Sequence, residues 1–357
     1  MSNIISKLNF LIKKPKVIIV AGEGRACAAE AICKILEKFK KEFLLFELDT
    51  EKIEEFEFFI KRSSLPILVV THTGDIPPNK DFFAGEIEKN TEIRKLARIM
   101  PSHGYLVLNF DDETVREIKD YNPPIAHSHI FTFGFQEGAN FRATDIRLNT
   151  GTNFKINYKG DIVPVWLERL FGKEQIFTAL TVAAVGVIFD LNLIEASQAL
   201  KDYHSLPGKM RLTKGVKNSW ILDDSKSATI FSMIEAIEIL GKISLPPNFG
   251  GESSPRKIAV LGDVIGIGKY TIEAHEAIGE KVVGNTDLLF TFGHRAKFIA
   301  QGAQSRGMSL DKIFQFDNIE GGKIQLQNEI KEGDLILVDG SKEMEMGKIV
   351  EEIKAGR

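Results

Sequence analysis

The feature that most constrains this chain is a short apolar segment that leads through a glycine turn into an amphipathic helix. Residues 17–21 are apolar and predict a buried strand, which Gly22 and Gly24 interrupt. Residues 26–36 then carry apolar side chains three and four positions apart, which predicts a helix. Such a turn directs backbone N–H groups and the positive end of the helix dipole toward a ligand, so the segment predicts a phosphate-binding turn.

The residues of this turn differ from those of a working ATP loop. Such a loop carries Gly-Lys-Thr or Gly-Lys-Ser, in which the lysine reaches the β and γ phosphates and the hydroxyl holds Mg²⁺. Here the turn has Gly24, Arg25 and Ala26, so an arginine replaces the lysine and the hydroxyl is missing. Two interpretations stay open: a phosphate site that uses Arg25, and a structural turn that binds nothing.

The next hundred residues repeat the alternation of strand and helix. This pattern predicts a parallel, doubly wound sheet, in which ligands bind at the carboxyl ends of the strands. The predicted strands are residues 43–48, 66–71 and 104–110, and the predicted helices are residues 51–62 and 84–99. The polar side chains that follow these strands are Glu47, His72, Asn109, Asp111 and Asp112.

The pattern changes between residues 129 and 165, where short alternating segments and glycine turns predict antiparallel strands. An apolar helix follows over residues 174–189. Leu206-Pro207-Gly208-Lys209 then forms the strongest hinge signal in the chain. Beyond it the alternation resumes, with strands predicted at residues 219–223, 257–261, 288–292 and 334–338.

The whole pattern predicts an α/β protein with two domains. We expect a central parallel-sheet, P-loop-like domain over residues 1–208 and a smaller Rossmann-like α/β domain over residues 209–357. The site is expected in the cleft between them, with Lys209 at the hinge. Because ligands of doubly wound sheets bind at strand ends, the polar residues after the strands are the candidate site.

Composition narrows the class of protein. Hydrophobic residues make up 43% and charged residues 27% of the chain, which is typical of a soluble globular protein, and the net charge of −3 gives no reason to expect nucleic acid as a partner. No apolar run reaches the about 18–20 residues of a membrane span. Cys27 and Cys33 are expected to be unpaired thiols in a reducing cytoplasm.

Several motifs occur together in an order that resembles the Mur ligase family. The resemblance covers about residues 15–355 and is most specific beyond residue 206. It rests on the glycine turn; on LNFDD (residues 108–112), LPGKM (206–210) and ILDDSKSATIFSM (221–233); on VLGDVIGIG (260–268) followed by His275; and on TFGHRA (291–296) and GDLILVDGS (333–341).

The resemblance implies an ATP-dependent carboxylate–amine ligase of peptidoglycan precursor synthesis, with ATP and Mg²⁺ as cofactors and an acyl phosphate intermediate. It implies catalytic roles for Glu47, Lys226 and Asp224, and a metal-binding role for Glu47. The nucleotide-binding residues that it implies are Gly22, Gly24, Arg25, Asn109, Asp111, Asp112, Lys209, Asp223 and Ser225.

The match to the family is uneven in the first domain. Besides Arg25, the family's threonines are replaced by Ala26 and Cys27 and a metal-associated histidine by Pro77, for which His72 is a candidate substitute. Further departures are Asn90 in place of a lysine that is carbamylated in several members, and Glu174, Gln175 and Thr178 in place of His, Asn and Asn. In the second domain Thr229-Ile230 replaces Asn-Pro, and Asp339 stands in place of a lysine.

These departures suggest an eroded catalytic site and a degenerate ATP loop, and they leave a non-catalytic Mur ligase-like binding or scaffold protein as the alternative. The family's N-terminal UDP-sugar domain has no counterpart here, so we expect that a partner chain could supply it. A remote alternative is a dinucleotide-binding oxidoreductase, because Gly22, Gly24 and Glu47 or Asp49 have a fingerprint-like spacing, although Cys27 is a poor third small residue.

Overall fold

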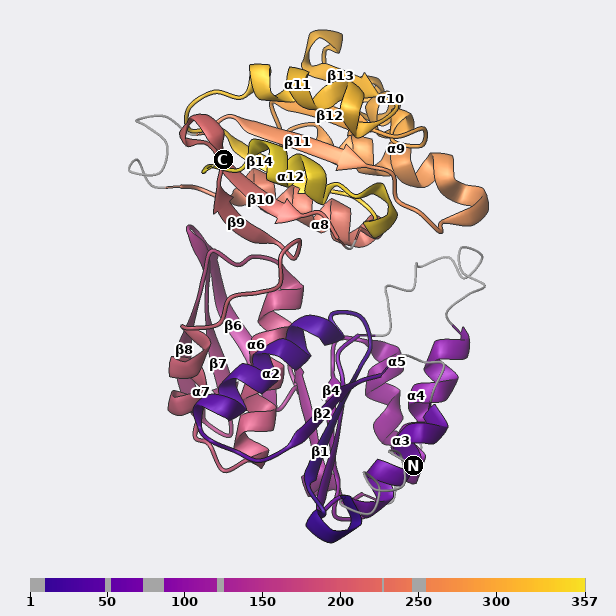
Figure 1. The fold of residues 1–357 in the computed structure, drawn as a ribbon, viewed down its shortest axis with the longest axis vertical. Helices are drawn as coiled ribbons and strands as arrows, with labels where there is room; N and C mark the ends of the chain where they lie inside the picture. The colour runs from indigo at the N-terminus through magenta and orange to yellow at the C-terminus, as the bar shows by residue number, and fades with distance from the viewer. Residues whose placement is uncertain are drawn as a thin grey trace. The chain divides into compact units, whose positions relative to one another are not determined.

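The computed structural model describes residues 10–48, 53–72, 87–120, 125–226, 228–245 and 255–356 (Figure 1). The chain forms two compact units. Unit 1 contains Met1–Ile146, Asn153–Trp166 and Lys173–Tyr203, and unit 2 contains Arg147–Thr152, Leu167–Gly172 and His204–Arg357. The division into domains at residue 208 stays a prediction.

Unit 1 is built on an eight-stranded sheet with the order β2-β1-β3-β4-β5-β6-β7-β8. The first five strands in chain order pair in parallel. Its elements are β1 (Lys16–Ala21), α2 (Arg25–Lys38), β2 (Leu44–Glu47), α3 (Ile53–Arg62), β3 (Leu65–Val70), α4 (Ile87–Ile99), β4 (Tyr105–Asn109), α5 (Glu113–Arg116), β5 (Ile130–Gly134), β6 (Phe141–Leu148), β7 (Gly151–Tyr158), β8 (Asp161–Glu168), α6 (Lys173–Ile188) and α7 (Leu193–Leu200).

The parallel part of this sheet is buried on both faces. In β1, Val17 and Ile19 pack with α3, α4 and α5, whereas Ile18 and Val20 point to the opposite face. Helices α2, α6 and α7 cover that second face (Figure 1). Burial on both faces explains why residues 17–21 read as a continuous apolar run, and it confirms the predicted doubly wound sheet.

The segment predicted to be antiparallel is only partly so. Two-residue turns join β6 to β7 and β7 to β8, which restricts these neighbouring strands to antiparallel pairing. The prediction is wrong for β5, which pairs in parallel with β4 and, over two residue pairs, with β6. Long-range pairing with β4 decides this direction, and the local glycine pattern does not encode it.

Unit 2 contains a six-stranded sheet with the order β13-β12-β11-β14-β10-β9, parallel except for the edge strand β9. This confirms the second α/β pattern. Its elements are β9 (Arg211–Lys214), β10 (Trp220–Asp224), α8 (Ile230–Lys242), β11 (Lys257–Gly262), α9 (Thr271–Val282), β12 (Leu288–Phe292), α10 (Lys297–Ser305), β13 (Ile313–Phe316), α11 (Ile319–Glu329), β14 (Leu335–Asp339) and α12 (Gly347–Ile353).

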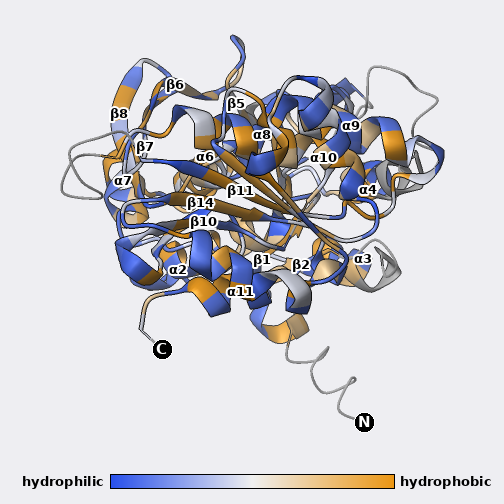
Figure 2. Ribbon diagram, turned by 90° about the horizontal axis from the view of Figure 1, so that it is seen from above, coloured by the Kyte–Doolittle hydropathy of each residue, from blue (hydrophilic) through white to orange (hydrophobic). Residues whose placement is uncertain are grey.

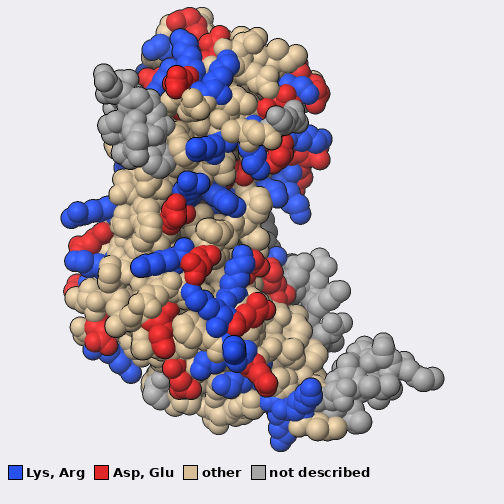
Figure 3. Space-filling model, turned by 60° about the vertical axis from the view of Figure 1, so that its left-hand side comes forward, with Lys and Arg blue, Asp and Glu red and all other residues tan. Residues whose placement is uncertain are grey.

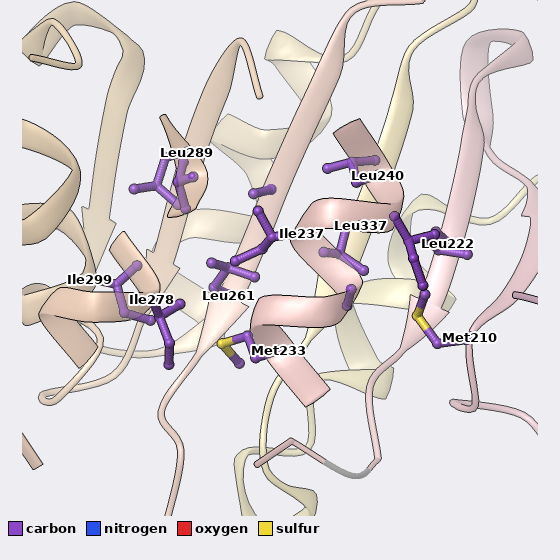
Figure 4. Packing of buried hydrophobic residues seen from close by; sticks show 14 of the residues in the cluster. Met210, Leu222, Met233, Ile237, Leu240, Leu261, Ile278, Leu289, Ile299 and Leu337 are labelled. Carbon is purple, nitrogen blue, oxygen red and sulfur yellow. The ribbon is translucent and has the colours of Figure 1, made fainter. Parts of the chain in front are cut away.

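The core of unit 2 lies on both faces of this sheet. One cluster joins the strands to α8, α9 and α10, and Figure 4 shows Ile237 of α8 beside Leu261 of β11 and Leu337 of β14. A second cluster joins the opposite face to α11 and α12. Apolar colour therefore follows the central parts of β11 and β14 (Figure 2). The strands are fixed by packing, which leaves their carboxyl ends to carry the polar groups.

Two sequence expectations bear on the kind of protein. Cys27 and Cys33 are free thiols, as expected, and burial raises the pKa of Cys33 to about 11. None of the helices formed by the described residues is both long and apolar enough to cross a bilayer.

Helices α9 and α10 approach each other closely because of a glycine. A Cβ atom on Gly279 would lie 2.0 Å from the carbonyl oxygen of Ile299. Gly279→Ala should therefore push the two helices apart and lower the free energy of unfolding by about 2 kcal/mol or more, measured by urea denaturation. In the control Gly321→Ala on α11, the nearest atom would be 3.5 Å away. There the gain in helix propensity should stabilise the chain by up to about 1 kcal/mol. Equal effects of the two changes would contradict this account.

Candidate functional site

The glycine turn of unit 1 is held against the end of β3. Gly22 and Gly24 have φ angles of 100° and 75°, which favour glycine. The N–H of Glu23 donates to the carbonyl oxygen of His72 at 2.6 Å, and the hydroxyl of Thr71 donates to the carbonyl oxygen of Ala21 at 3.0 Å. A Cβ on Gly22 would lie 2.4 Å from that His72 oxygen. The turn is therefore fixed by contacts that only a glycine permits.

The side chain of Arg25 faces back into the turn. Its Nη1 donates to the carbonyl oxygen of Gly22 at 3.3 Å. Helix α2 starts at Arg25 with Gly24 as its N-cap, and no side chain caps it through a hydrogen bond. Its first turn also contains no acidic residue. The positive end of the helix dipole thus remains at this turn, while the guanidinium interacts with the backbone.

Asp111, which follows β4, clamps the neighbouring turn. Its carboxylate accepts hydrogen bonds from the N–H groups of Phe135 at 2.6 Å and Gln136 at 3.0 Å, directly after β5. A Cβ on Gly134 would lie 2.6 Å from this carboxylate. Both oxygens of Asp111 therefore hold the backbone, which is a structural role beside the nucleotide-binding role that the resemblance implies.

The residues on either side of Asp111 organise the same edge of the sheet. The side-chain oxygen of Asn109 accepts from the N–H of Asp111 at 2.9 Å, and Asp112 caps α5 by accepting from the N–H of Val115 at 3.1 Å. Asp112 also lies 2.8 Å from Nδ1 of His72. The amide nitrogen of Asn109 is buried without a hydrogen-bond partner in the described part of the chain, so its two N–H donors remain for a ligand.

Glu47 ends β2 at the same edge. It lies opposite Val20 in the register of β1 and β2, and its side chain is exposed. Its carboxylate is also one of the charges that raise the pKa of Cys33 on α2, after burial and the charges of two glutamates on the helix. Glu47 is therefore at the expected strand end and open to solvent. Its assignment as a metal ligand stays a prediction.

In unit 2 the candidate residues at the end of β10 form a compact clamp. Asp223 accepts hydrogen bonds from the N–H of Gly208 at 2.9 Å, from the hydroxyl of Ser225 at 2.7 Å and from the N–H of Ser225 at 3.2 Å. The stem of Lys226 packs over Gly208, since a Cβ there would lie 2.6 Å from its Cγ. The LPGKM and ILDDSK motifs are thus joined through Asp223, and Lys226 extends to solvent.

Asp339 brings an acidic charge into the same group. It ends β14, opposite Asp224 in the register with β10, and it is fully buried. Burial raises its pKa from 3.8 to about 7; the amide of Gly340 and the charge of Lys209 oppose this rise, and Asp223 adds to it. The structure therefore brings Lys209, Asp223 and Asp339 together. Sequence reasoning missed Asp339 as a site residue and identified it only as a departure from the family's lysine.

The VLGD and TFGHRA motifs are joined by the device already seen at Asp111. Asp263, after β11, accepts from the N–H groups of Arg295 at 2.9 Å and Ala296 at 2.7 Å. A Cβ on Gly293 would lie 2.4 Å from Asp263. These motifs therefore build the edge of the sheet itself.

His275 has a local role. Its Nε2 accepts from the N–H of Val264 at 3.1 Å, and its Nδ1 lies 2.6 Å from the carbonyl oxygen of Thr271. This fixes a neutral ring with the proton on Nδ1, and burial lowers its pKa. His275 thus anchors the loop after β11 to α9.

The structure groups the predicted residues by unit. Gly22, Gly24 and Arg25 share the turn; Asn109, Asp111 and Asp112 share the end of β4; and Lys209, Asp223, Asp224, Ser225 and Lys226 lie around the end of β10. Pro77 and Asp49 lie outside the described residues, and the side chain of Asn90 is also not described. Among the described residues, no group of three or more His, Cys, Asp or Glu side chains is arranged to hold a metal ion.

Comparison with known proteins identifies relatives of this architecture. The UDP-N-acetylmuramoyl-tripeptide--D-alanyl-D-alanine ligase of Bacillus subtilis (strain 168) is 25% identical over 224 residues, which cover 62% of this chain and 46% of the relative. The UDP-N-acetylmuramate--L-alanine ligase of Dictyoglomus turgidum is 25% identical over 364 residues, which cover 93% of this chain and 74% of the relative. The match thus spans about half the length of the first relative. No family model matches the chain.

Solved structures share the fold. MurF from Acinetobacter baumannii gives a TM-score of 0.78 at 18% identity, covering 97% of this chain and 78% of that chain. MurF ligase from Thermotoga maritima, in complex with ADP, gives 0.72 at 17% identity, covering 98% and 83%. Fold and sequence therefore define the class: the relatives of this chain are Mur ligases. They include ligases of the D-alanyl-D-alanine type.

The pKa of Asp339 predicts a dependence of stability on pH. Because its folded-state pKa lies above the ordinary value, the folded state keeps a proton that the unfolded chain loses, so this carboxyl makes folding less favourable as the pH rises through about 4 to 7. A side-chain amide at this position cannot ionise, so Asp339→Asn should abolish this loss of folding stability. The free energy of unfolding of Asp339→Asn, taken relative to that of the wild type, should increase by about 2–3 kcal/mol when the pH rises from about 5 to about 8.5.

Urea unfolding at the two pH values measures this difference. Asp161→Asn, at an exposed position of β8, is the control and should show the same stability difference from the wild type at both. A constant difference for Asp339→Asn would contradict the raised pKa.

Proposed function

We propose that this chain is a Mur-type acid–amine ligase that acts on a peptidoglycan precursor. In this reaction the γ-phosphoryl group of ATP is transferred to a carboxylate, giving an acyl phosphate and ADP. An amine then attacks the acyl carbon, and the tetrahedral intermediate releases inorganic phosphate as the amide bond forms. The identity of the amine, the identity of the precursor and a cytoplasmic location are all part of the proposal. The matches to the D-alanyl-D-alanine ligases cover less than half of each relative's length.

One observation carries the proposal: the clamp that Asp223 forms with Gly208 and Ser225. It joins the LPGKM motif to residues 223–226, for which the family resemblance implies a role in closing over the nucleotide, and it leaves Lys226 extended into solvent. Lys226 is thereby available to a phosphate oxygen, and Asp224, buried next to it, is the predicted catalytic carboxylate.

The described residues form no group of three or more His, Cys, Asp or Glu side chains that could hold Mg²⁺ without the nucleotide. The glycine turn has no side-chain hydroxyl, and the hydroxyl of Thr71 donates to backbone carbonyls. We therefore assign no step to the metal ion. Glu47 is the residue that we expect to approach it, since Glu47 is exposed at the end of β2.

A second candidate function is favoured by Arg25. Its Nη1 donates to the carbonyl oxygen of Gly22, so one N–H of the guanidinium is directed to the backbone of the turn and not to a phosphate. A non-catalytic Mur ligase-like binding or scaffold protein would have this property. Both candidate functions are compatible with a partner chain that supplies a UDP-sugar domain. This partner stays a prediction, which co-purification of a second chain with this protein would test.

The two functions differ in nucleotide binding. Calorimetric titration with Mg-ATP and with a non-hydrolysable analogue should show binding that Lys226→Ala and Glu47→Ala each weaken by about tenfold or more, since each removes a charge assigned to the nucleotide or its metal. Lys201→Ala and Glu37→Ala, at exposed positions away from the candidate site, are matched controls and should bind as the wild type does. Absence of binding up to about 5 mM nucleotide, far above the range of ordinary KM values, would favour the scaffold.

A further inference from the structure

Glu174 reaches the N-terminal end of α2 from a different helix. It lies in the first turn of α6, which begins at Lys173. Its Cγ, Cδ and Oε1 atoms are 3.0, 3.3 and 3.5 Å from the position that a Cβ on Gly24 would take. Gly24 is the N-cap of α2, so a carboxylate lies against the end of the helix where the glycine turn would receive a phosphate.

Two helix dipoles favour this position of the carboxylate. Glu174 belongs to the first turn of α6, and it simultaneously faces the N-terminus of α2, which has no acidic residue in its own first turn. The two helices pack side by side on one face of the sheet (Figure 1). A negative charge at a helix N-terminus is stabilising, and here both positive ends act on the same group.

The cation of the turn is directed to the backbone through one of its N–H groups. Arg25 donates to the carbonyl oxygen of Gly22, within the turn. On the face drawn in Figure 3, Lys and Arg side chains lie interspersed with Asp and Glu side chains. A phosphate that approached Gly24 would meet a like charge at short range, where Coulomb repulsion is strong.

We propose that Glu174 is a specificity-determining residue whose carboxylate lies beside the anion position of the glycine turn, against Gly24, and competes with nucleotide phosphate for that position. The chain thus supplies its own anion at the N-terminus of α2. For a phosphate to bind there, the side chain of Glu174 must move away from Gly24. This inference goes beyond the proposed function, because it concerns phosphate affinity and holds with or without turnover.

The test compares the full-length wild type with Glu174→Gln, which removes the charge and keeps the shape. ADP and inorganic pyrophosphate are the probes, each titrated calorimetrically. Glu174→Gln should bind both at least about tenfold more tightly than the wild type. Glu174→Ala, which also removes the side chain that fills the space, should show the same gain and guards against an effect of the new amide.

The control is Glu30→Gln. Glu30 is on α2 and pairs with Lys34 at 2.8 Å, so this change removes the same charge from the same helix without touching Gly24. It should leave both affinities within about twofold of the wild type. Thermal unfolding with and without pyrophosphate gives an independent readout, because the ligand should raise the melting temperature of Glu174→Gln more than that of the wild type.

The inference is overturned if Glu174→Gln and Glu174→Ala bind the probes no better than the wild type, whether all of them bind or none does. It is also overturned if Glu30→Gln gains as much, since the effect would then be one of net charge. The proposed ligase function fails by a different result, the absence of amide product in an assay of the wild type. The two failures are therefore distinguishable.

Discussion

The structure depends on one repeated interaction, a carboxylate at the end of a parallel strand that accepts hydrogen bonds from the backbone of the next turn. Asp111 does this after β4 and Asp263 after β11, and each faces a glycine that ends or follows the neighbouring strand. Strand ends expose N–H groups that need acceptors, and a carboxylate provides two strong ones. Both units therefore use acidic side chains to shape the edge at which α/β proteins bind ligands.

This interaction explains what the sequence could and could not predict. The strands were predictable, because burial on both faces leaves continuous apolar runs such as residues 257–261. The pairing of Asp263 with residues 295 and 296 joins segments 32 and 33 positions apart, and no local pattern encodes it. The motifs VLGD and TFGHRA could be recognised as belonging together, but their physical connection becomes visible only in the fold. The same limit applies to the parallel pairing of β5 and β6, which depends on the neighbouring strand β4.

The candidate site was predictable in position and less so in chemistry. The glycine turn, the end of β4 and the end of β10 were expected, since strand ends can be read from the sequence. The orientation of Arg25 was not, because an arginine can extend toward solvent or fold back, and here it donates to Gly22. The contact of Glu174 with Gly24 was also hidden, since it depends on how α6 packs against α2. Residue identity thus indicated where a ligand could bind, whereas side-chain direction decides what the site attracts.

Acidic side chains have different electrostatic environments in the two units. In unit 1 the carboxylate of Glu174 lies at two helix N-termini, where backbone dipoles stabilise its negative charge. In unit 2 the carboxyl of Asp339 is buried beside Asp223, and burial favours its neutral form in spite of the nearby Lys209. A ligand that carries negative charge would therefore meet the carboxylate of Glu174 at the glycine turn of unit 1, and a ligand at the end of β14 in unit 2 would meet the titratable carboxyl of Asp339 beside Lys209. Since protonation of Asp339 leaves Lys209 with one counter-charge fewer, the attraction of this edge of unit 2 for an anion should increase as the pH falls.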